Sequence, residues 1–298
     1  MKILILYFSG TGNTQKIAEL YSKAFKECGD EVITETLPDA ENKISALNLN
    51  EFDLIGFGYP IHAFNAPANV LKLAEKIPLL KEQKNAFVFK TSGEPVRMSD
   101  VSSLKLIKIL KKRNISVTNE YQYVMPYNII FRHSDEMAYR MWDVAQKIVP
   151  LDCREIKNGV PKKAKRMFMG GFLAWFLRIE HWGARFNGKR YKVSSDCVHC
   201  GLCAKTCPAN NITLAPDGKI KFGKNCLMCM RCSFTCPKNA IKIGLFNSWK
   251  VNGAYSFDPP PADAPNPPDK HANYCKKAYN RYFSEAEQKI NAARNEAN

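Results

Sequence analysis

The segment from Lys2 to Thr14 reads KILILYFSGTGNT and determines how the first half of the chain is expected to fold. It starts with an apolar run, which is typical of a strand buried on both faces of a sheet. A turn rich in glycine and hydroxyl groups follows, and a helical pattern begins at Thr14. The turn therefore lies at a helix N-terminus, where unpaired N–H groups and the helix dipole favour a phosphate. The candidate phosphate-binding residues are Ser9, Gly10, Thr11, Gly12, Asn13 and Thr14.

The turn contains no lysine, so it is not a nucleoside-triphosphate loop, and it also lacks the G-x-G-x-x-G pattern. An uncharged cradle of hydroxyl and amide groups suits a tightly held monophosphate.

Strand and helix signals alternate over residues 1–150, which predicts a doubly wound, five-stranded parallel sheet of order 2-1-3-4-5. The expected strands are Lys2–Phe8, Glu31–Leu37, Asp53–Gly58, Asn85–Thr91 and Glu120–Met125. The expected helices cover residues 13–28, 66–77, 101–113 and 135–149.

Two further loops are expected at the phosphate site, because ligands of open α/β sheets bind beyond the carboxyl ends of the strands. Their candidate binding residues are Gly58, Tyr59, Pro60, Phe64, Thr91, Ser92 and Gly93. The rings of Tyr59 and Phe64 are candidates for stacking on a planar cofactor, with a simple turn and a packing role as the alternatives. His62 is either a proton-transfer residue or a non-catalytic loop histidine.

Residues 197–237 contain the spacing C-x2-C-x2-C-x3-C-P twice, with a period of 29 residues. This is the ligand spacing of two cubane iron–sulfur clusters, in which the fourth cysteine of each run binds the other cluster. The expected ligands of one cluster are Cys197, Cys200, Cys203 and Cys236, and those of the other are Cys226, Cys229, Cys232 and Cys207. Structural zinc is the alternative, but three evenly spaced cysteines and a fourth before proline fit zinc poorly.

The remaining thiols, Cys28, Cys153 and Cys275, are scattered and are expected to be ordinary. Met1 leads directly into the first strand, without a secretory signal, and no apolar window of about 18 residues predicts a membrane span. Clustered metal-type cysteines favour a reducing, cytoplasmic location.

The charge of the chain is concentrated in its middle. The formal net charge is +16, and residues 151–250 hold 19 Lys and Arg against 5 Asp and Glu. This excess partly balances anionic cofactors and otherwise favours a partner with an acidic surface or an anionic membrane.

Residues 151–195 form a basic and aromatic connector, whose apolar centre is either a buried inter-domain helix or a segment lying in a membrane interface. A nucleic-acid partner is not expected, because the connector lacks a recognised binding fold and its aromatic residues follow a helical stripe.

The expected domains are 1–150, the connector 151–195, a small cysteine-rich domain 196–246, and 247–298 with a proline-rich spacer at 258–268 and a C-terminal helix. The final helix either docks on the body or stays exposed.

The chain resembles the flavodoxin–ferredoxin fusion family of anaerobic bacteria, the ferrodoxins. Residues 1–150 resemble flavodoxins through Ser9–Thr14, Gly58–Pro60 and Thr91–Gly93, and residues 196–243 resemble bacterial two-cluster ferredoxins through both cysteine runs. The resemblance implies a flavodoxin-like α/β domain with FMN, a small α+β ferredoxin-like domain with two [4Fe-4S] clusters, and electron transfer as the activity.

Three functional hypotheses follow, of which the third is a non-catalytic redox sensor or membrane-associated adaptor that uses the basic connector. The first is a relay between the flavin and the clusters that links two-electron and one-electron redox partners. The second is a reductase of a small quinone-like acceptor, fed by the clusters. The electron donor, the acceptor, the direction of flow and the formation of a homo-oligomer are left open.

Overall fold

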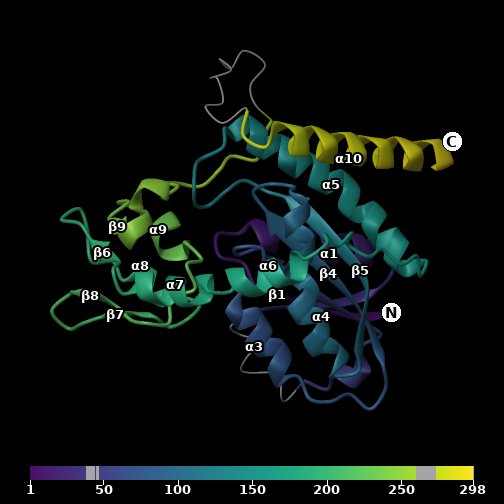
Figure 1. The fold of residues 1–298 in the computed structure, drawn as a ribbon, viewed down its shortest axis with the longest axis horizontal. Coiled ribbons are helices and arrows are strands. Elements are labelled where there is room, and N and C mark those ends of the chain that lie inside the picture. The colour runs from purple at the N-terminus through teal and green to yellow at the C-terminus, as the bar shows by residue number, and fades with distance from the viewer. Residues whose placement is uncertain (38–43, 45–46, 260–272, 298) are drawn as a thin grey trace.

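The computed structural model describes residues 1–37, 44, 47–259 and 273–297, and its largest element is a five-stranded parallel sheet (Figure 1). The strand order is β2-β1-β3-β4-β5, as predicted, with every neighbouring pair parallel. The strands are β1 (Lys2–Tyr7), β2 (Glu31–Thr36), β3 (Leu54–Pro60), β4 (Lys84–Ser92) and β5 (Ile115–Val124).

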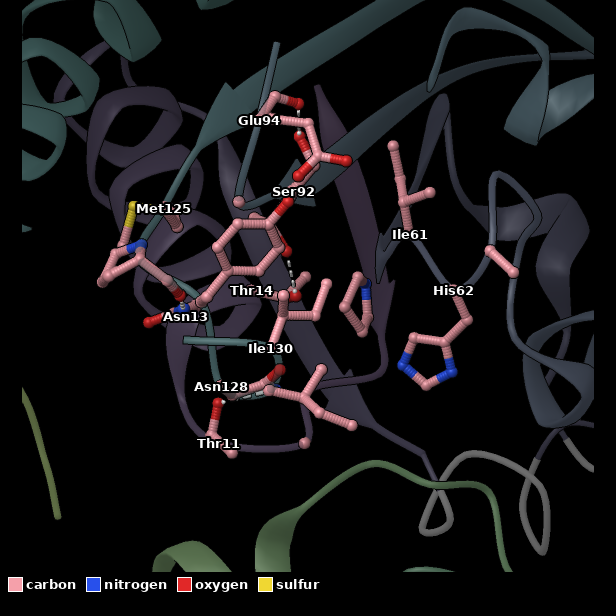
Figure 2. Close-up of a pocket in the computed structure, with 18 of the residues that line it drawn as sticks. Thr11, Asn13, Thr14, Ile61, His62, Ser92, Glu94, Met125, Asn128 and Ile130 are labelled. Atoms are coloured by element: carbon pink, nitrogen blue, oxygen red, sulfur yellow. Dashed lines mark hydrogen bonds between the residues drawn. The ribbon is translucent and has the colours of Figure 1, made fainter. Parts of the chain in front are cut away.

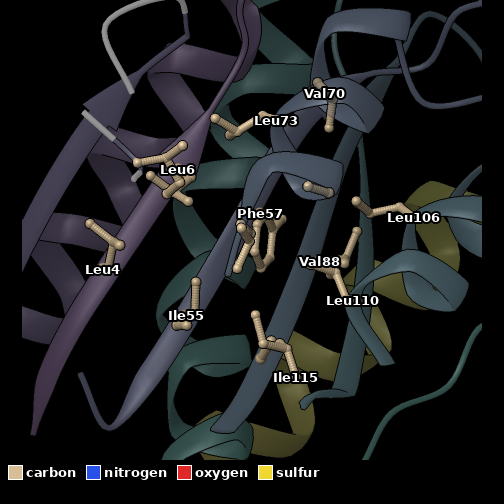
Figure 3. Close-up of a cluster of buried hydrophobic side chains, with 14 of the residues drawn as sticks. Leu4, Leu6, Ile55, Phe57, Val70, Leu73, Val88, Leu106, Leu110 and Ile115 are labelled. Atoms are coloured by element: carbon tan, nitrogen blue, oxygen red, sulfur yellow. The ribbon is translucent and has the colours of Figure 1, made fainter. Parts of the chain in front are cut away.

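Helices cover both faces of this sheet, because its central strands are apolar on both sides. On one face, α3 (Ala68–Lys76) and α4 (Leu104–Lys111) pack through Val70, Leu73, Leu106 and Leu110 against alternate residues of the strands (Figure 3). On the other face lie α1 (Asn13–Glu27) and α5 (Asp135–Lys157). The short 3-10 segments of this domain are η1 (Leu49–Glu51) and η2 (Arg97–Ser103).

Two predicted boundaries differ from the structure by five residues or more. The fifth strand begins at Ile115 rather than Glu120, directly after Asn114, which turns the chain with a φ of 60°. The last helix of the domain runs to Lys157, beyond the predicted boundary at 150 and through Pro150. It continues because Cys153 and Ile156 still pack on the sheet, and such packing outweighs the missing proline N–H.

The connector forms α6 (Gly170–Leu177) and α7 (Glu180–Gly188), which lead into the cysteine-rich region. That region has two small antiparallel pairs, β6–β9 and β7–β8. Its elements are β6 (Lys192–Val193), α8 (Leu202–Lys205), β7 (Ile212–Leu214), β8 (Ile220–Phe222), α9 (Arg231–Phe234), β9 (Ile241–Lys242) and η3 (Gly244–Trp249). None of the described helices is both long enough and apolar enough to cross a membrane.

The C-terminal helix α10 (Lys276–Ala297) returns to the first domain and lies along α5 (Figure 1). Lys289 pairs with the buried Asp152 and with Glu155, each at 2.5 Å. Tyr282 accepts a hydrogen bond from the backbone N–H of Val124. Of the two alternatives left open for this helix, docking on the body is therefore the one observed. The predicted spacer at 258–268 lies outside the described residues, apart from 258 and 259.

Candidate functional site

A cavity of about 250 Å³ opens at the carboxyl ends of β1, β3, β4 and β5, where the sequence predicts a cofactor (Figure 2). It is lined by Ser9, Gly10, Thr11, Asn13, Thr14, Pro60, Ile61, His62, Ala63, Phe64, Thr91, Ser92, Gly93, Glu94, Ser99, Met125, Pro126, Tyr127, Asn128, Ile129, Ile130, Glu180 and Met228. No lysine or arginine occurs in this described lining, so the cavity offers a phosphate only neutral donors.

The loop before α1 is held by hydrogen bonds to its neighbours. Gly12 adopts a left-handed φ of 104°, and its N–H donates to Ser9 Oγ at 3.1 Å. Asn13 Nδ2 donates to the carbonyl oxygen of Pro126 at 2.8 Å, and the hydroxyl groups of Thr14 and Thr91 lie 2.8 Å apart. These contacts join three of the loops around the cavity, so they fix the shape of the predicted phosphate cradle.

Ten of the thirteen predicted cofactor-binding residues line the cavity, and Gly12, Gly58 and Tyr59 do not. The prediction that the Tyr59 ring stacks on a cofactor is wrong, because that side chain is fully buried in the core under α3 and α4. Gly58 instead makes room for a packing partner, since a Cβ there would lie 2.1 Å from the Phe89 ring. Phe64 lines the cavity as predicted, with a left-handed φ of 59°.

The loop after β5, residues 125–130, also lines the cavity and was not predicted from the sequence. Its Tyr127 is stacked on His133, with ring centroids 5.3 Å apart. Gly93 permits this placement, because a Cβ there would meet the Tyr127 ring at 2.3 Å. The only signal in the sequence was position, since this loop follows the last strand of the sheet.

Three titratable side chains in the cavity lining have shifted pKa values. Burial raises the pKa of Glu94 to about 7, and it raises the pKa of Glu180 to about 7 as well. Burial, with a smaller effect of His181, lowers the pKa of His62 to about 4. Near neutral pH the cavity therefore holds a neutral imidazole and two carboxyl groups close to their midpoint.

The two carboxyl groups also leave hydrogen-bonding capacity in the cavity. Oε2 of Glu94 and Oε2 of Glu180 are buried and have no hydrogen-bond partner among the described residues. A buried polar atom without a partner is costly, so a ligand with N–H or O–H groups fits here. The cavity therefore offers neutral donors in the loop from Ser9 to Thr14 and unpaired acceptors at Glu94 and Glu180. This combination suits a cofactor that carries a phosphate and a ring with polar edges.

The eight cysteines of the repeats surround two small cavities, four around each. We call Cys197, Cys200, Cys203 and Cys236 the far quartet and Cys207, Cys226, Cys229 and Cys232 the near quartet. These are the two sets into which the sequence analysis divides the cysteines. Within the described residues, no three Cys, His, Asp or Glu side chains converge closely enough to hold a single metal ion.

The backbone around the quartets repeats with the period of the sequence. In the first run, the N–H of His199 donates to Cys197 Sγ at 3.4 Å, and the second run has the same bond from Met228 to Cys226. Likewise, the N–H groups of Asn211 and Ala240 donate to Cys207 and Cys236 at 3.3 Å. Such bonds stabilise negative charge on sulfur, which suits thiolate ligands of a cluster.

Burial makes free thiolates unfavourable at the near quartet. It raises the pKa of Cys229 to about 12 and also raises the pKa values of Cys226 and Cys232. These three buried cysteines ionise together only beside strong positive charge, which the iron of a cluster supplies. The donor set therefore fits an iron–sulfur group.

The near quartet abuts the phosphate loop of the first domain. A Cβ on Gly10 would lie 2.3 Å from the carbonyl oxygen of Cys229, so the two backbones are in direct contact. Arg231 donates through Nε to the carbonyl oxygen of Gly10 at 2.8 Å and through its other nitrogens to the carbonyl oxygens of Ser9 and Thr206. Met228 completes the contact, because it lines the cofactor cavity itself.

Comparison with protein families finds two matches on this chain. Residues 4–107 match the flavodoxin domain, and residues 196–240 match the 4Fe-4S dicluster domain. The first match covers the part of the cavity lining from Ser9 to Ser99, and the second covers both cysteine runs. No curated protein matches the chain.

Solved structures similar to the chain include several flavin proteins. The flavodoxin of Streptococcus pneumonia TIGR4 is 13% identical and has a TM-score of 0.37, with 53% of this chain and 99% of that chain covered. General stress protein 14 of Treponema denticola, solved in complex with FMN, is 12% identical with a TM-score of 0.38, covering 52% and 99%. Oxidised Flavodoxin 1 of Bacillus cereus is 18% identical with a TM-score of 0.35, covering 51% and 98%.

Proposed function

Because the chain joins a flavodoxin domain to a 4Fe-4S dicluster domain, we propose that it transfers electrons between an FMN and two [4Fe-4S] clusters within one molecule. The observation that carries this proposal is the contact of Gly10 with Cys229, which brings the phosphate loop against a cluster ligand. A bound flavin exchanges one or two electrons and each cluster one, so the protein links two-electron to one-electron redox partners.

The residues that would hold FMN are those of the cavity. The loop from Ser9 to Thr14 would bind its phosphate through backbone N–H and hydroxyl groups. The loops at Pro60–Phe64, Thr91–Glu94 and 125–130 would enclose the flavin ring. Phe64 and Tyr127 are the aromatic side chains of this lining, and Glu94 and Glu180 supply unpaired acceptors.

The arrangement of the two quartets supports an order of electron transfer. The near quartet adjoins the cavity through Met228 and Cys229, whereas the far quartet includes the exposed Cys200 beside the exposed Val198 and His199. We therefore assign the near quartet to exchange with the flavin and the far quartet to exchange with a protein partner. Lys238 lines the far cavity, and the surrounding region is basic, which suits a partner with an acidic surface.

Metal and flavin analysis tests the composition. Anaerobically purified protein is expected to contain about eight iron atoms, from two four-iron clusters, and one FMN per chain. Zinc in place of iron would exclude the iron–sulfur proposal. Replacing Cys229 or Cys200 by Ala is expected to remove or convert one cluster each, and full iron in both variants would contradict the ligand assignment.

The same pair of variants tests the order of transfer. Cys200→Ala alters the far quartet. After partial reduction of this variant, electrons should still equilibrate between the flavin and the remaining cluster, as followed by flavin absorbance. Electron exchange with an acidic protein carrier such as a ferredoxin should become slower. In Cys229→Ala, equilibration between flavin and iron signals should slow instead. Equal effects of both substitutions on both rates would overturn the assigned order.

A second candidate function is reduction of a small quinone-like acceptor at the flavin cavity. The two carboxyl groups support it, because Glu94 and Glu180 have pKa values near 7 and are suited to donating protons. Steady turnover of a quinone with dithionite as the donor, lowered by Glu180→Gln, would favour this function. Failure with a broad panel of acceptors, together with fast exchange with protein carriers, would favour the relay.

A further inference from the structure

The connector helices α6 and α7 expose an unusual number of large apolar side chains. The exposed fractions are 94% for Phe168, 62% for Phe172, 60% for Trp175, 58% for Phe176, 65% for Ile179, 75% for Trp182 and 56% for Phe186. The aromatic members alone expose on the order of 800 Å² of side chain, judged from about 200 Å² per ring. This exceeds the apolar patch of a typical monomer, roughly 300–600 Å². We call these seven residues the apolar ridge.

The ridge follows one face of an almost continuous helix. The spacing from Phe172 through Phe176 and Ile179 to Phe186 is that of neighbouring helical turns, and backbone hydrogen bonds continue across the junction at Arg178 and Ile179. Figure 1 shows α7 and α6 running end to end across the molecule. The interpretation of this connector as a buried inter-domain helix is therefore wrong, although its apolar stripe exists.

Small residues, rather than bulky ones, face the protein. Gly170 and Ala174 are buried, and a Cβ on Gly170 would lie 2.6 Å from Val101. The carbonyl oxygen of Ala174 accepts a hydrogen bond from Asn65 at 2.9 Å, and Ala184 is buried on α7. The helices are thus fixed to the body through their small residues, which directs the bulky ones outward.

Positive charge surrounds the ridge. Residues 161–193 contain nine Lys and Arg and a single acidic residue, Glu180. Glu180 faces the cofactor cavity, where burial raises its pKa. Lys165, Arg185, Lys189 and Lys192 are exposed, and none of them forms a salt bridge with a described residue. The charge that the ridge presents to a partner is therefore positive.

We propose that the apolar ridge docks the protein on an anionic membrane surface. Tryptophan and phenylalanine enter the boundary between headgroups and acyl chains, and Lys and Arg beside them attract anionic headgroups. Aliphatic side chains favour lipid over nucleic acid, because the exposed Ile179 of the ridge and the exposed Leu173 of α6 cannot stack on bases in the way that aromatic rings do. The uncompensated positive charge favours lipid over a second copy of the chain, since two such surfaces repel each other.

Vesicle binding by the complete cofactor-loaded chain tests the proposal, independently of electron transfer. The protein should sediment with vesicles of phosphatidylglycerol and phosphatidylcholine, less so at high salt, and not with phosphatidylcholine alone. Trp175→Ser/Trp182→Ser should weaken binding at least tenfold. Arg185→Gln/Lys189→Gln should weaken it about fivefold per charge, from about 1 kcal/mol each.

Matched variants control for general effects of substitution. Ile179→Ser should weaken binding, whereas Leu79→Ser should not, although the two side chains are 65% and 64% exposed. Lys111→Gln/Lys112→Gln, on exposed residues at the end of α4, controls for the charge change. Tryptophan fluorescence should be quenched by brominated lipid in the parent protein and not in Trp175→Ser/Trp182→Ser, which keeps Trp142 and Trp249. Unchanged flavin and iron contents would show that each variant is folded.

Three results would overturn the proposal. The first is no sedimentation with anionic vesicles at low salt, and the second is equal binding by Ile179→Ser and Leu79→Ser. The third is binding of another partner to the ridge in the absence of vesicle binding. That partner would be a second copy of the chain, if Trp175→Ser/Trp182→Ser dissociates a dimer, or a nucleic acid, if the protein binds a single-stranded RNA oligonucleotide.

Discussion

Gly10 serves two purposes at the scale of single residues. It belongs to the loop that precedes α1, and it also lies against the backbone of Cys229 in the near quartet. Arg231 reinforces the same contact by donating to the carbonyl oxygens of Ser9 and Gly10. A change at Gly10 therefore acts on the cofactor loop and on the domain contact together.

Replacing Gly10 by Ala should lower flavin affinity and stability, because its Cβ would lie 2.3 Å from a carbonyl oxygen. Overpacking of this kind costs about 1–3 kcal/mol. Titration of FMN fluorescence and thermal unfolding measure the two effects. Gly183→Ala is the control, since a Cβ there meets nothing within 4 Å. Unchanged flavin affinity in Gly10→Ala would contradict the contact.

Glu94 should make stability depend on pH. Burial raises its pKa to about 7, so the native state binds this proton more tightly than the unfolded state does. The unfolding free energy should fall between about pH 4.5 and pH 7, by on the order of 3 kcal/mol, and then level off. Urea unfolding at several pH values should show a flatter profile for Glu94→Gln than for the exposed control Glu82→Gln. Parallel profiles for the two variants would contradict the assignment.

At the scale of elements, α10 completes the first domain although it follows the cysteine-rich region in the chain. The hydroxyl of Tyr279 donates to the carbonyl oxygen of Gly93, in a loop of the cofactor cavity. Arg281 donates to the carbonyl oxygen of Pro95 at 2.8 Å, and Lys289 neutralises the buried Asp152. The C-terminal helix therefore supports both the sheet and the cavity.

Replacing Lys289 by Met should destabilise the protein by about 2–3 kcal/mol, because the only salt bridge left to the buried Asp152 would be the longer one to Lys162 at 3.6 Å, beside the neutral hydrogen bond from Tyr123. Chemical denaturation followed by circular dichroism measures this loss. Lys277→Met, at an exposed position of the same helix, should have little effect. A loss of similar size in both variants would mean that the ion pair is not responsible.

Elements with a strong local pattern were predicted correctly from the sequence, whereas features that depend on contact with a distant part of the chain were not. The apolar runs predicted the sheet and its order, and the cysteine spacing predicted which four cysteines surround each small cavity. Tyr59 was placed wrongly because β3 extends to Pro60, so alternation along the strand directs Phe57 and Tyr59 to the same buried face. If the third strand had been predicted to end at Pro60 rather than at Gly58, the alternation would have placed Tyr59 in the core.

Other features had no local signal. Glu180 and Met228 reach the cofactor cavity only because the connector and the near quartet dock on the first domain. From the sequence, the apolar stripe of α6 and α7 was either a buried inter-domain helix or a membrane-interface segment, because a helical apolar stripe alone does not say what covers it. The direction in which such a stripe faces depends on which side of the helix packs on the rest of the protein. Here the small residues on the opposite side of the helix pack there, so the apolar stripe faces outward.

At the scale of the whole molecule, the cysteine-rich region has little apolar core of its own. Its buried cluster consists of Tyr191, Met230, Ile241 and Ile243, packed against cysteines of both quartets. A region of about 50 residues with so small a core needs bound metal or similar support to stay folded. The clusters would therefore be structural as well as redox groups.

Removing iron with a chelator under anaerobic conditions should unfold residues 196–243 and leave the first domain folded. Hydrogen exchange should show rapid exchange in the cysteine-rich region and continued protection in β1, β3 and β4. The flavin should also bind more weakly, because Met228 and the Gly10 contact would be lost. Continued protection of the cysteine-rich region without iron would contradict the dependence on metal.

The position of α10 has a consequence for how the protein is made. A ribosome releases the first domain before the cysteine repeats and α10 after them, and nascent domains begin to fold as they emerge. Until the final helix appears, Asp152 has no Lys289 and the Gly93 loop has no Tyr279. The first domain thus stays incompletely packed throughout synthesis of the cysteine repeats, which couples its maturation to translation at least as far as Lys289.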